Sequence, residues 1–242
     1  MNELIIRNAR LPGATATGTD TDLTQPLQDI WIEAGRIRAI DQNIQAARPQ
    51  TPSIDAQGHL VTTPFVDPHF HMDATLSYGQ PRVNASGTLL EGIALWGELK
   101  PHLTQEALVE RALQYCDWAA AKGLLAIRSH VDVCDDRLLA VEALLHVREQ
   151  VRDYIDLQLV AFPQDGLLRS PGALDNLRRA LAMGVDVVGG IPHFERTMAD
   201  GAESVRVLTE LAAEQGLRVD MHCDETDDPM SRHIETLAFH TQ

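Results

Sequence analysis

The 242-residue sequence is 44% hydrophobic and carries a formal net charge of −15 at pH 7. This is enough apolar material for a sizeable core, and the charge has the wrong sign for binding nucleic acid or an anionic membrane. No apolar run approaches the ~20 residues that cross a bilayer, and no secretory signal is evident, so we expect a soluble, cytoplasmic protein. The three cysteines, Cys116, Cys134 and Cys223, lack C-x-x-C spacing, which argues against a disulfide framework or a thiolate zinc site.

Short strands joined by turns are predicted for the first sixty residues. The alternating apolar residues at 4–9, 29–33 and 36–40 predict three strands, and Gly35 suits a hairpin between the last two. Residues 11–28, rich in Thr, Asp, Gly and Pro, predict a loop. We therefore expect residues 1–62 to form a small β module with a structural role.

Two histidines follow at the end of a short apolar run, in the stretch PFVDPHFHMD at residues 64–73. Because alternate side chains of a strand point the same way, His69 and His71 can reach one point while Phe70 turns away. Histidine is the commonest metal ligand, so this point is a candidate metal site. Two histidines on a strand can equally be core or surface residues without a metal, so this pair alone does not establish a metal site. The next residues, 74–97, contain several Gly, Pro, Asn and Ser residues and predict a long loop.

From Thr104 onward, helices and strands alternate. The predicted helices begin at a Thr104 cap, at Asp135 or Asp136, at Ser170-Pro171, and at an Asp200-x-x-Glu203 capping box. The predicted strands cover residues 124–130, 157–162, 185–191 and 217–222. This alternation indicates parallel βα units. Since no G-x-G-x-x-G or P-loop follows the first strand, we predict an α/β fold in which residues 63–242 form about five βα units of a (β/α)8 (TIM) barrel.

Polar side chains that can bind a metal or a substrate stand at the end of each predicted barrel strand. They are His69 and His71; His130 and Asp132; Gln164; His193 and Glu195; and His222, Asp224 and Glu225. In a barrel, the carboxyl ends of the strands face one common active site. Their recurrence at successive strand ends favours the metal-site interpretation of the first pair.

These motifs resemble the amidohydrolase superfamily, and specifically its cytosine deaminase branch. The matching segments include residues 64–73, GTLLEGI at 87–93, RSHVDV at 128–133, FPQDG at 162–166 and DMHCDE at 220–225. The resemblance implies that His69, His71 and His222 bind one divalent metal ion, Fe2+ or Zn2+. It also implies that Glu225 shuttles protons and that Gln164 hydrogen-bonds a pyrimidine.

The chemistry of these residues agrees with that assignment. A divalent metal lowers the pKa of a bound water toward neutrality, and a carboxylate such as Glu225 could carry the proton to a ring nitrogen. The amide of Gln164 can read an N–H/C=O edge, while Phe162 is a candidate for the pocket lining or for the core. We expect hydrolytic deamination of a free aminopyrimidine, such as cytosine or isocytosine, with release of ammonia.

Two alternatives stay open. Residues 72–75, Met-Asp-Ala-Thr, depart from the Leu-Asp-Thr-Thr of cytosine deaminases, so isocytosine, 5-substituted cytosines and an aminotriazine such as ammelide are also candidate substrates. The other alternative is a non-catalytic barrel subunit. Residues 185–193 contain no lysine that could bridge two metals, which disfavours a binuclear site, and the H-x-E and P-C-x-x-C signature of the unrelated zinc deaminases is absent.

The remaining polar residues have weaker assignments. The pairs His130 with Asp132 and His193 with Glu195 could support the site or only hold loops. We expect four further histidines to lie on the surface: His102, His146, His233 and His240. Because a barrel needs eight strands, we expect these residues to be the N-terminal part of a longer polypeptide. The resemblance implies that a C-terminal segment of it completes the β module, and we also expect a homo-oligomer.

Overall fold

The computed structural model describes residues 3–12, 26–46 and 48–242, and the chain divides into two compact units, residues 1–63 and 64–242. In the smaller unit, strands β1 (Glu3–Ala9), β2 (Gln28–Glu33), β3 (Arg36–Asp41) and β4 (Ser53–Asp55) form one sheet in the order β3-β2-β1-β4. The predicted hairpin joins β2 and β3, with Ala34 at φ 51° and Gly35 at φ 74° in its turn. Most of the predicted 11–28 loop lies outside the described residues.

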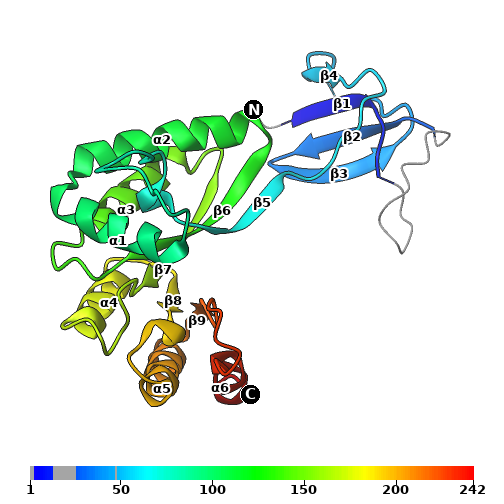
Figure 1. The fold of residues 1–242 in the computed structure, drawn as a ribbon. Coiled ribbons are helices and arrows are strands. Elements are labelled where there is room, and N and C mark those ends of the chain that lie inside the picture. The colour runs from blue at the N-terminus through cyan, green and yellow to red at the C-terminus, as the bar shows by residue number, and fades with distance from the viewer. Residues whose placement is uncertain (1–2, 13–25, 47) are drawn as a thin grey trace. The chain divides into compact units, whose positions relative to one another are not determined.

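The larger unit is a partial (β/α)8 barrel, as the alternation predicts. Its five strands are β5 (Phe65–Phe70), β6 (Leu124–Asp132), β7 (Asp156–Phe162), β8 (Val187–Gly190) and β9 (Arg218–Met221). They are parallel and hydrogen-bonded in chain order. Figure 1 shows the helices packed around this curved sheet. They are α1 (Leu89–Leu99), α2 (Gln105–Ala121), α3 (Leu139–Val151), α4 (Ala173–Ala182), α5 (Met198–Gln215) and α6 (His233–His240).

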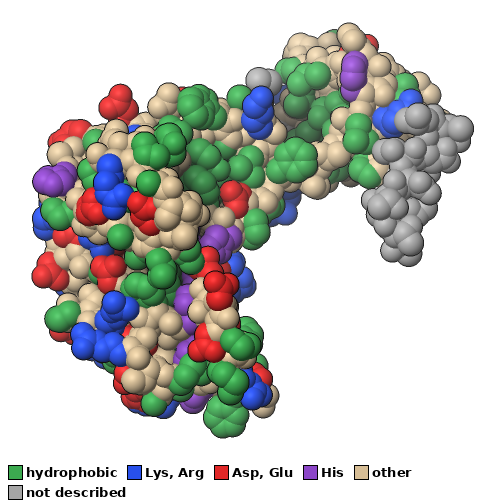
Figure 2. All heavy atoms as spheres, in the orientation of Figure 1, with side chains coloured by type: hydrophobic (Ala, Val, Ile, Leu, Met, Phe, Trp, Pro, Cys, Tyr) green, Lys and Arg blue, Asp and Glu red, His purple; other side chains and the backbone are tan. Residues whose placement is uncertain are grey.

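The core of the larger unit lies between the sheet and its helices. Fully buried side chains include Leu108 and Cys116 of α2, Leu144 of α3, and Ile127 and Leu159 of the sheet. The helices carry acidic and basic side chains interspersed on the face drawn in Figure 2. Within the described residues, no helix is long and apolar enough to cross a membrane.

The prediction of one long loop over residues 74–97 was wrong, because α1 begins at Leu89. Thr88 caps this helix, its hydroxyl accepting from the backbone N–H of Glu91. Gly92 and Gly97 lower the helix propensity of the segment and hide the helix from a sequence reading. The Thr-x-x-Glu cap was the available signal.

Three helices that were predicted begin at other residues than expected. Helix α5 begins at Met198, where Thr197 caps it by accepting from the N–H of Asp200, so the predicted Asp200 cap was wrong. Helix α4 begins at Ala173 rather than at Pro171. Helix α3 begins directly after Leu138, whose backbone adopts a left-handed conformation. Neither of the two predicted aspartates caps this helix. Asp135 instead binds Arg137, and Asp136 accepts from Asn176.

Candidate metal centre

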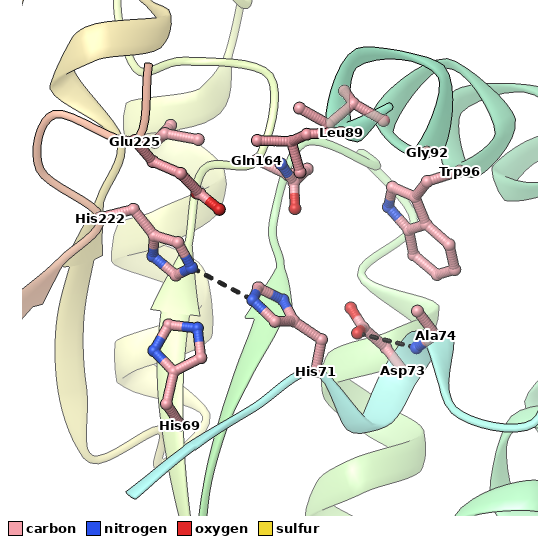
Figure 3. Close-up of a pocket in the computed structure, with 12 residues that line it drawn as sticks. His69, His71, Asp73, Ala74, Leu89, Gly92, Trp96, Gln164, His222 and Glu225 are labelled. Carbon is pink, nitrogen blue, oxygen red and sulfur yellow. Dashed lines mark hydrogen bonds between the residues drawn. The ribbon is translucent and has the colours of Figure 1, made fainter. Parts of the chain in front are cut away.

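Three histidines converge at the carboxyl ends of the first and last strands of the larger sheet. His69 lies on β5, His71 follows that strand directly, and His222 directly follows β9. One ligand nitrogen from each of the three lies within 4.8 Å of the others. The Nε2 atoms of His71 and His222 are 3.2 Å apart and point toward each other in Figure 3. Residues 151 positions apart in sequence thus meet because the sheet curls.

The three imidazoles favour their neutral form. Burial, reinforced by the neighbouring His130 and His69, lowers the pKa of His71 to about 4. Burial and the same imidazole cluster lower the pKa of His222 to about 3. The pKa of His69 is lowered as well, by burial and by His130, against an opposing effect of Asp220. At neutral pH each ring therefore has a nitrogen lone pair available for a metal.

The spacing of these donors fits a divalent metal ion. Two nitrogens bound to one tetrahedral zinc at 2.0–2.1 Å lie about 3.3 Å apart, close to the 3.2 Å between the His71 and His222 nitrogens. Imidazole nitrogens suit zinc and iron among the common metals. Three protein ligands beside an open cavity are also the arrangement of catalytic rather than structural zinc sites.

A second set of side chains supports the histidine rings from inside the sheet. His130 of β6 is fully buried, and its ring centroid lies 4.5 Å from that of His69 and 4.7 Å from that of His222. Its Nε2 lies 3.1 Å from Asp220, which also binds Arg128 at 2.7 Å. The hydrogen bond from His130, opposed by burial and aided by Arg128, lowers the pKa of Asp220 to about 2. His130 is thus engaged with Asp220.

Phe162 also packs against the histidines. Its ring centroid lies 4.4 Å from that of His222 and 5.5 Å from that of His71, and its side chain is 1% exposed. It is not among the described residues that line the cavity beside the histidines. Of the two roles open to Phe162, pocket lining or core, the structure favours the core, where its ring contacts the imidazoles.

A cavity of about 370 Å³ opens beside the three histidines. Gln164, after β7, and Glu225, after β9, face it from the loops (Figure 3). Helix α1 forms the wall across from His222, through Leu89, Gly92, Ile93 and Trp96. Nothing in the sequence pattern predicted this apolar wall, although residues 87–93 resemble the family.

Asp132 and Asp73 hold that wall in place. Asp132 accepts from the indole N–H of Trp96 at 2.7 Å and pairs with Lys100 at 2.6 Å. Lys100 also binds Asp165, beside Gln164, at 2.7 Å. Buried Asp73 accepts from the backbone N–H of Asp132 at 2.9 Å, and burial raises its pKa to about 7. Asp132 therefore joins β6 to α1.

The other polar residues at the strand ends hold loops. The Glu195 carboxylate accepts from the backbone N–H groups of Leu167, Leu168 and Arg169 at 2.6, 3.0 and 2.9 Å. Asp224 accepts from Ser231, His233 and Ile234 at 2.6, 2.8 and 3.0 Å. His193 Nδ1 lies 3.0 Å from the carbonyl oxygen of His222 and so braces a candidate ligand.

One predicted surface histidine is buried. His233 is only 2% exposed, and its ring packs so closely against Gly201 of α5 that a side chain at position 201 would collide with it. The prediction for His233 was wrong because its position at the start of a short helix gave no sign of the neighbouring glycine. Of the other three, His102 and His146 are exposed and His240 is half-buried.

Comparisons with known proteins agree with this architecture. A family model described as "Amidohydrolase family" matches residues 53–242. N-isopropylammelide isopropyl amidohydrolase of Pseudomonas sp. (strain ADP) is 32% identical, over 99% of this chain and 57% of its own length. Pterin deaminase of Rhizobium rhizogenes is 27% identical, over 96% of this chain and 52% of its own.

The same picture comes from solved structures. The crystal structure of 5-methylcytosine deaminase from Klebsiella pneumoniae, liganded with 5-fluorocytosine, aligns with a TM-score of 0.87 and 44% identity, covering 98% of this chain and 55% of that one. The chain thus spans a little over half the length of the relatives that it matches.

Proposed function

Because the chain belongs to the amidohydrolase family, whose members generally bind a divalent metal ion, we propose that the intact protein hydrolytically deaminates a free aminopyrimidine, such as cytosine or isocytosine. His69, His71 and His222 would hold the metal. One observation carries the proposal: three neutral imidazoles meet at a cavity that Glu225 and Gln164 also face. The 44% identity to a 5-methylcytosine deaminase supports a pyrimidine as substrate.

Glu225 is the proposed proton carrier of this reaction. A divalent metal at the three histidines supplies an acidified water as the nucleophile. The Glu225 carboxylate lies beside His222, and among the described residues it has no hydrogen-bond or ion-pair partner that would compete for it. It takes the proton from the attacking water and delivers it to the ring nitrogen next to the reacting carbon. Glu225 then moves the remaining proton of the attacking oxygen to the amine, which leaves as ammonia as a carbonyl forms.

Gln164 and α1 position the ring in this proposal. The Gln164 side chain lines the cavity and has one acceptor and two donors available for an N–H/C=O edge. Leu89, Ile93 and Trp96 cover the ring with apolar surface and exclude water from it. Phe162 acts on the substrate indirectly, by packing against the His71 and His222 rings.

An aminotriazine is the second candidate substrate. It is supported by the 32% identity to an N-isopropylammelide isopropyl amidohydrolase and by the Met72-Asp73-Ala74-Thr75 segment, two residues of which line the cavity. A non-catalytic barrel subunit is the remaining alternative, and the neutral, converging imidazoles count against it.

The test uses the intact protein purified with its metal. Bound iron and zinc are measured, and ammonia release is followed with cytosine, isocytosine and ammelide, using the His71→Ala variant as a blank. We expect about one metal ion per chain and release from an aminopyrimidine. Release from ammelide alone would favour the triazine. Bound metal with no release from any of them would refute the amino-heterocycle assignment, and a metal-free protein would favour the non-catalytic subunit.

A further inference from the structure

One ammonium group joins two walls of the cavity beside the histidines. Lys100 follows α1 directly, and its backbone N–H donates to the carbonyl of Trp96 in the last turn of that helix. Its side chain is 12% exposed and lies between two carboxylates, with Nζ 2.6 Å from Asp132 and 2.7 Å from Asp165. Since Asp132 ends β6 and Asp165 lies in the loop after β7, one side chain connects three segments.

On one side, Lys100 acts on the apolar wall through Asp132. The same oxygen, Oδ2 of Asp132, accepts from the Lys100 ammonium and from the indole N–H of Trp96, the latter at 2.7 Å. The Asp132 side chain is only 3% exposed, so its charge needs a countercharge, which Lys100 supplies. The place of the Trp96 indole in the wall therefore depends on Lys100.

On the other side, Lys100 acts on Gln164 through the next residue, Asp165. A 2.9 Å hydrogen bond between its end residues closes the turn at 163–166. Within this turn the Gln164 side chain faces the cavity (Figure 3), while that of Asp165 binds Lys100. Among the described residues, the Gln164 side chain has no hydrogen-bond partner of its own. The turn alone sets its direction, and Asp165 fixes the turn.

Lys100 can hold both carboxylates at once because it stays charged. Burial opposes the charge, but Asp132 and Asp165 together raise the pKa of the ammonium. An ammonium has three donors, and two of them are used here. An apolar side chain of similar length would release both carboxylates.

We propose that Lys100 is a positioning residue that couples the two walls of the cavity, setting the Gln164 amide against the ring edge of the substrate and Trp96 against the ring. The inference rests on the proposed function and adds to it a residue outside the cavity. Lys100 is not among the described residues that line the cavity. It therefore acts on the substrate only through the side chains that it positions.

The test uses two pairs of variants of the intact, metal-loaded protein. Lys100→Met removes both contacts, and Lys122→Met, at an exposed position at the end of α2, is its control. Asp165→Ala removes only the contact that leads to Gln164, and Asp153→Ala removes the same charge at a side chain that is 95% exposed. We measure metal content, kcat/KM for cytosine and isocytosine with and without Gln164→Ala, and backbone amide exchange by mass spectrometry.

The kinetic measurement tests whether the effect passes through Gln164. Asp165→Ala should lower kcat/KM by roughly 10–100-fold, the cost of a misplaced positioning group. Metal content should be unchanged, since Asp165 is not one of the three converging ligands. In the Gln164→Ala background, Asp165→Ala should change kcat/KM by less than about twofold. An equal loss in both backgrounds would overturn the proposed positioning of Gln164 and leave the proposed reaction standing.

Amide exchange tests the coupling without catalysis. Lys100→Met should speed exchange by about tenfold or more both at residues 164–166 and in the last turn of α1, and Asp165→Ala only at the former. Both controls should exchange as wild type does. Unchanged exchange in a folded Lys100→Met protein would overturn the coupling.

Two further outcomes are also decisive. If Lys100→Met does not fold, Asp165→Ala takes its place: faster exchange confined to residues 164–166 supports the proposal, and wild-type exchange there overturns it. If the wild-type protein releases ammonia from no heterocycle, the proposed reaction fails. Faster exchange in both segments of Lys100→Met would then still support the coupling of the walls, and unchanged exchange would overturn it.

Discussion

The histidine cluster and the carboxylates of Glu195 and Asp224 stand at the same end of the sheet, yet their bonding capacity is used differently. Glu195 accepts three backbone N–H groups, and Asp224 accepts two together with a hydroxyl. The Nε2 of His71 instead faces another imidazole nitrogen, that of His222. A polar side chain at a strand end therefore marks a site only where the protein leaves its bonding capacity free.

The reason lies in the backbone of the loops. The loop after β7 exposes N–H groups that need an acceptor, and Glu195 from the loop after β8 provides it. Asp224 does the same within its own segment, for the N–H groups at the start of α6. Two neutral imidazoles whose Nε2 atoms lie 3.2 Å apart can each carry the ring proton on Nδ1, so that both Nε2 lone pairs remain for a cation. Substitutions in both groups and changes of pH test this contrast.

The largest effect is expected for His71→Ala. Removal of one of three ligands should abolish stoichiometric metal binding and lower kcat/KM on the order of 10³-fold or more, since the metal generates the nucleophile. Metal analysis and ammonia release measure the two effects. His146→Ala, at an exposed position on α3, is the control and should keep both. A His71→Ala protein with full metal content would contradict the assignment.

Glu225→Gln should separate proton transfer from metal binding. The substitution keeps the size of the side chain and removes its basicity, so kcat should fall by about 10²–10⁴-fold, the usual contribution of general acid–base catalysis. Metal content should stay at the wild-type level, because Glu225 is not one of the three converging ligands. Loss of metal, or wild-type kcat, would remove the proposed role.

Glu195→Ala tests a carboxylate that holds a loop rather than a ligand of the candidate metal site. It leaves three backbone N–H groups without their acceptor, so the free energy of unfolding should fall by about 1–3 kcal/mol. Urea denaturation of the intact protein measures this, and metal content should be unchanged. The control Glu214→Ala, at an exposed position of α5, should stay within about 0.5 kcal/mol of wild type. Metal loss in Glu195→Ala with unchanged stability would show that the carboxylate belongs to the site.

The smallest effect is expected from mild acid. The pKa values of His71 and His222, about 4 and about 3, lie below the ordinary value of 6.5, and that of His69 is lowered as well, so protons compete with the metal at lower pH than they do for ordinary imidazoles. Zinc affinity of the metal-stripped protein should change by less than about threefold from pH 7 to 5.5, beyond any change in the buffer, and fall steeply below pH 4. A decline that begins near pH 6.5 would indicate imidazoles with ordinary pKa values.

The same lowered pKa values affect stability. Between pH 6.5 and 4 the unfolded chain binds protons at these histidines that the folded chain does not. The metal-free protein should therefore lose stability as the pH falls through this window.

Local patterns in the amino-acid sequence were sufficient for the alternation of strands and helices and for the alignment of His69 with His71. The two-residue period of a strand specifies that alignment without any distant contact. The end positions of Gln164, His222 and Glu225 follow from the same strand pattern. Helix α1 was not predictable in this way, because Gly92 and Gly97 mask its helical pattern.

Packing between distant segments settled the rest. The 3.2 Å approach of His71 to His222 depends on the curl of a five-stranded sheet, and the burial of His233 depends on a glycine 32 positions earlier, in α5. Glu195 and Asp224 are as polar in the sequence as the histidines are. Only the folded chain brings N–H groups to those carboxylates and leaves the imidazoles facing a cavity, because hydrogen-bond partners are set by tertiary contacts and not by local periodicity.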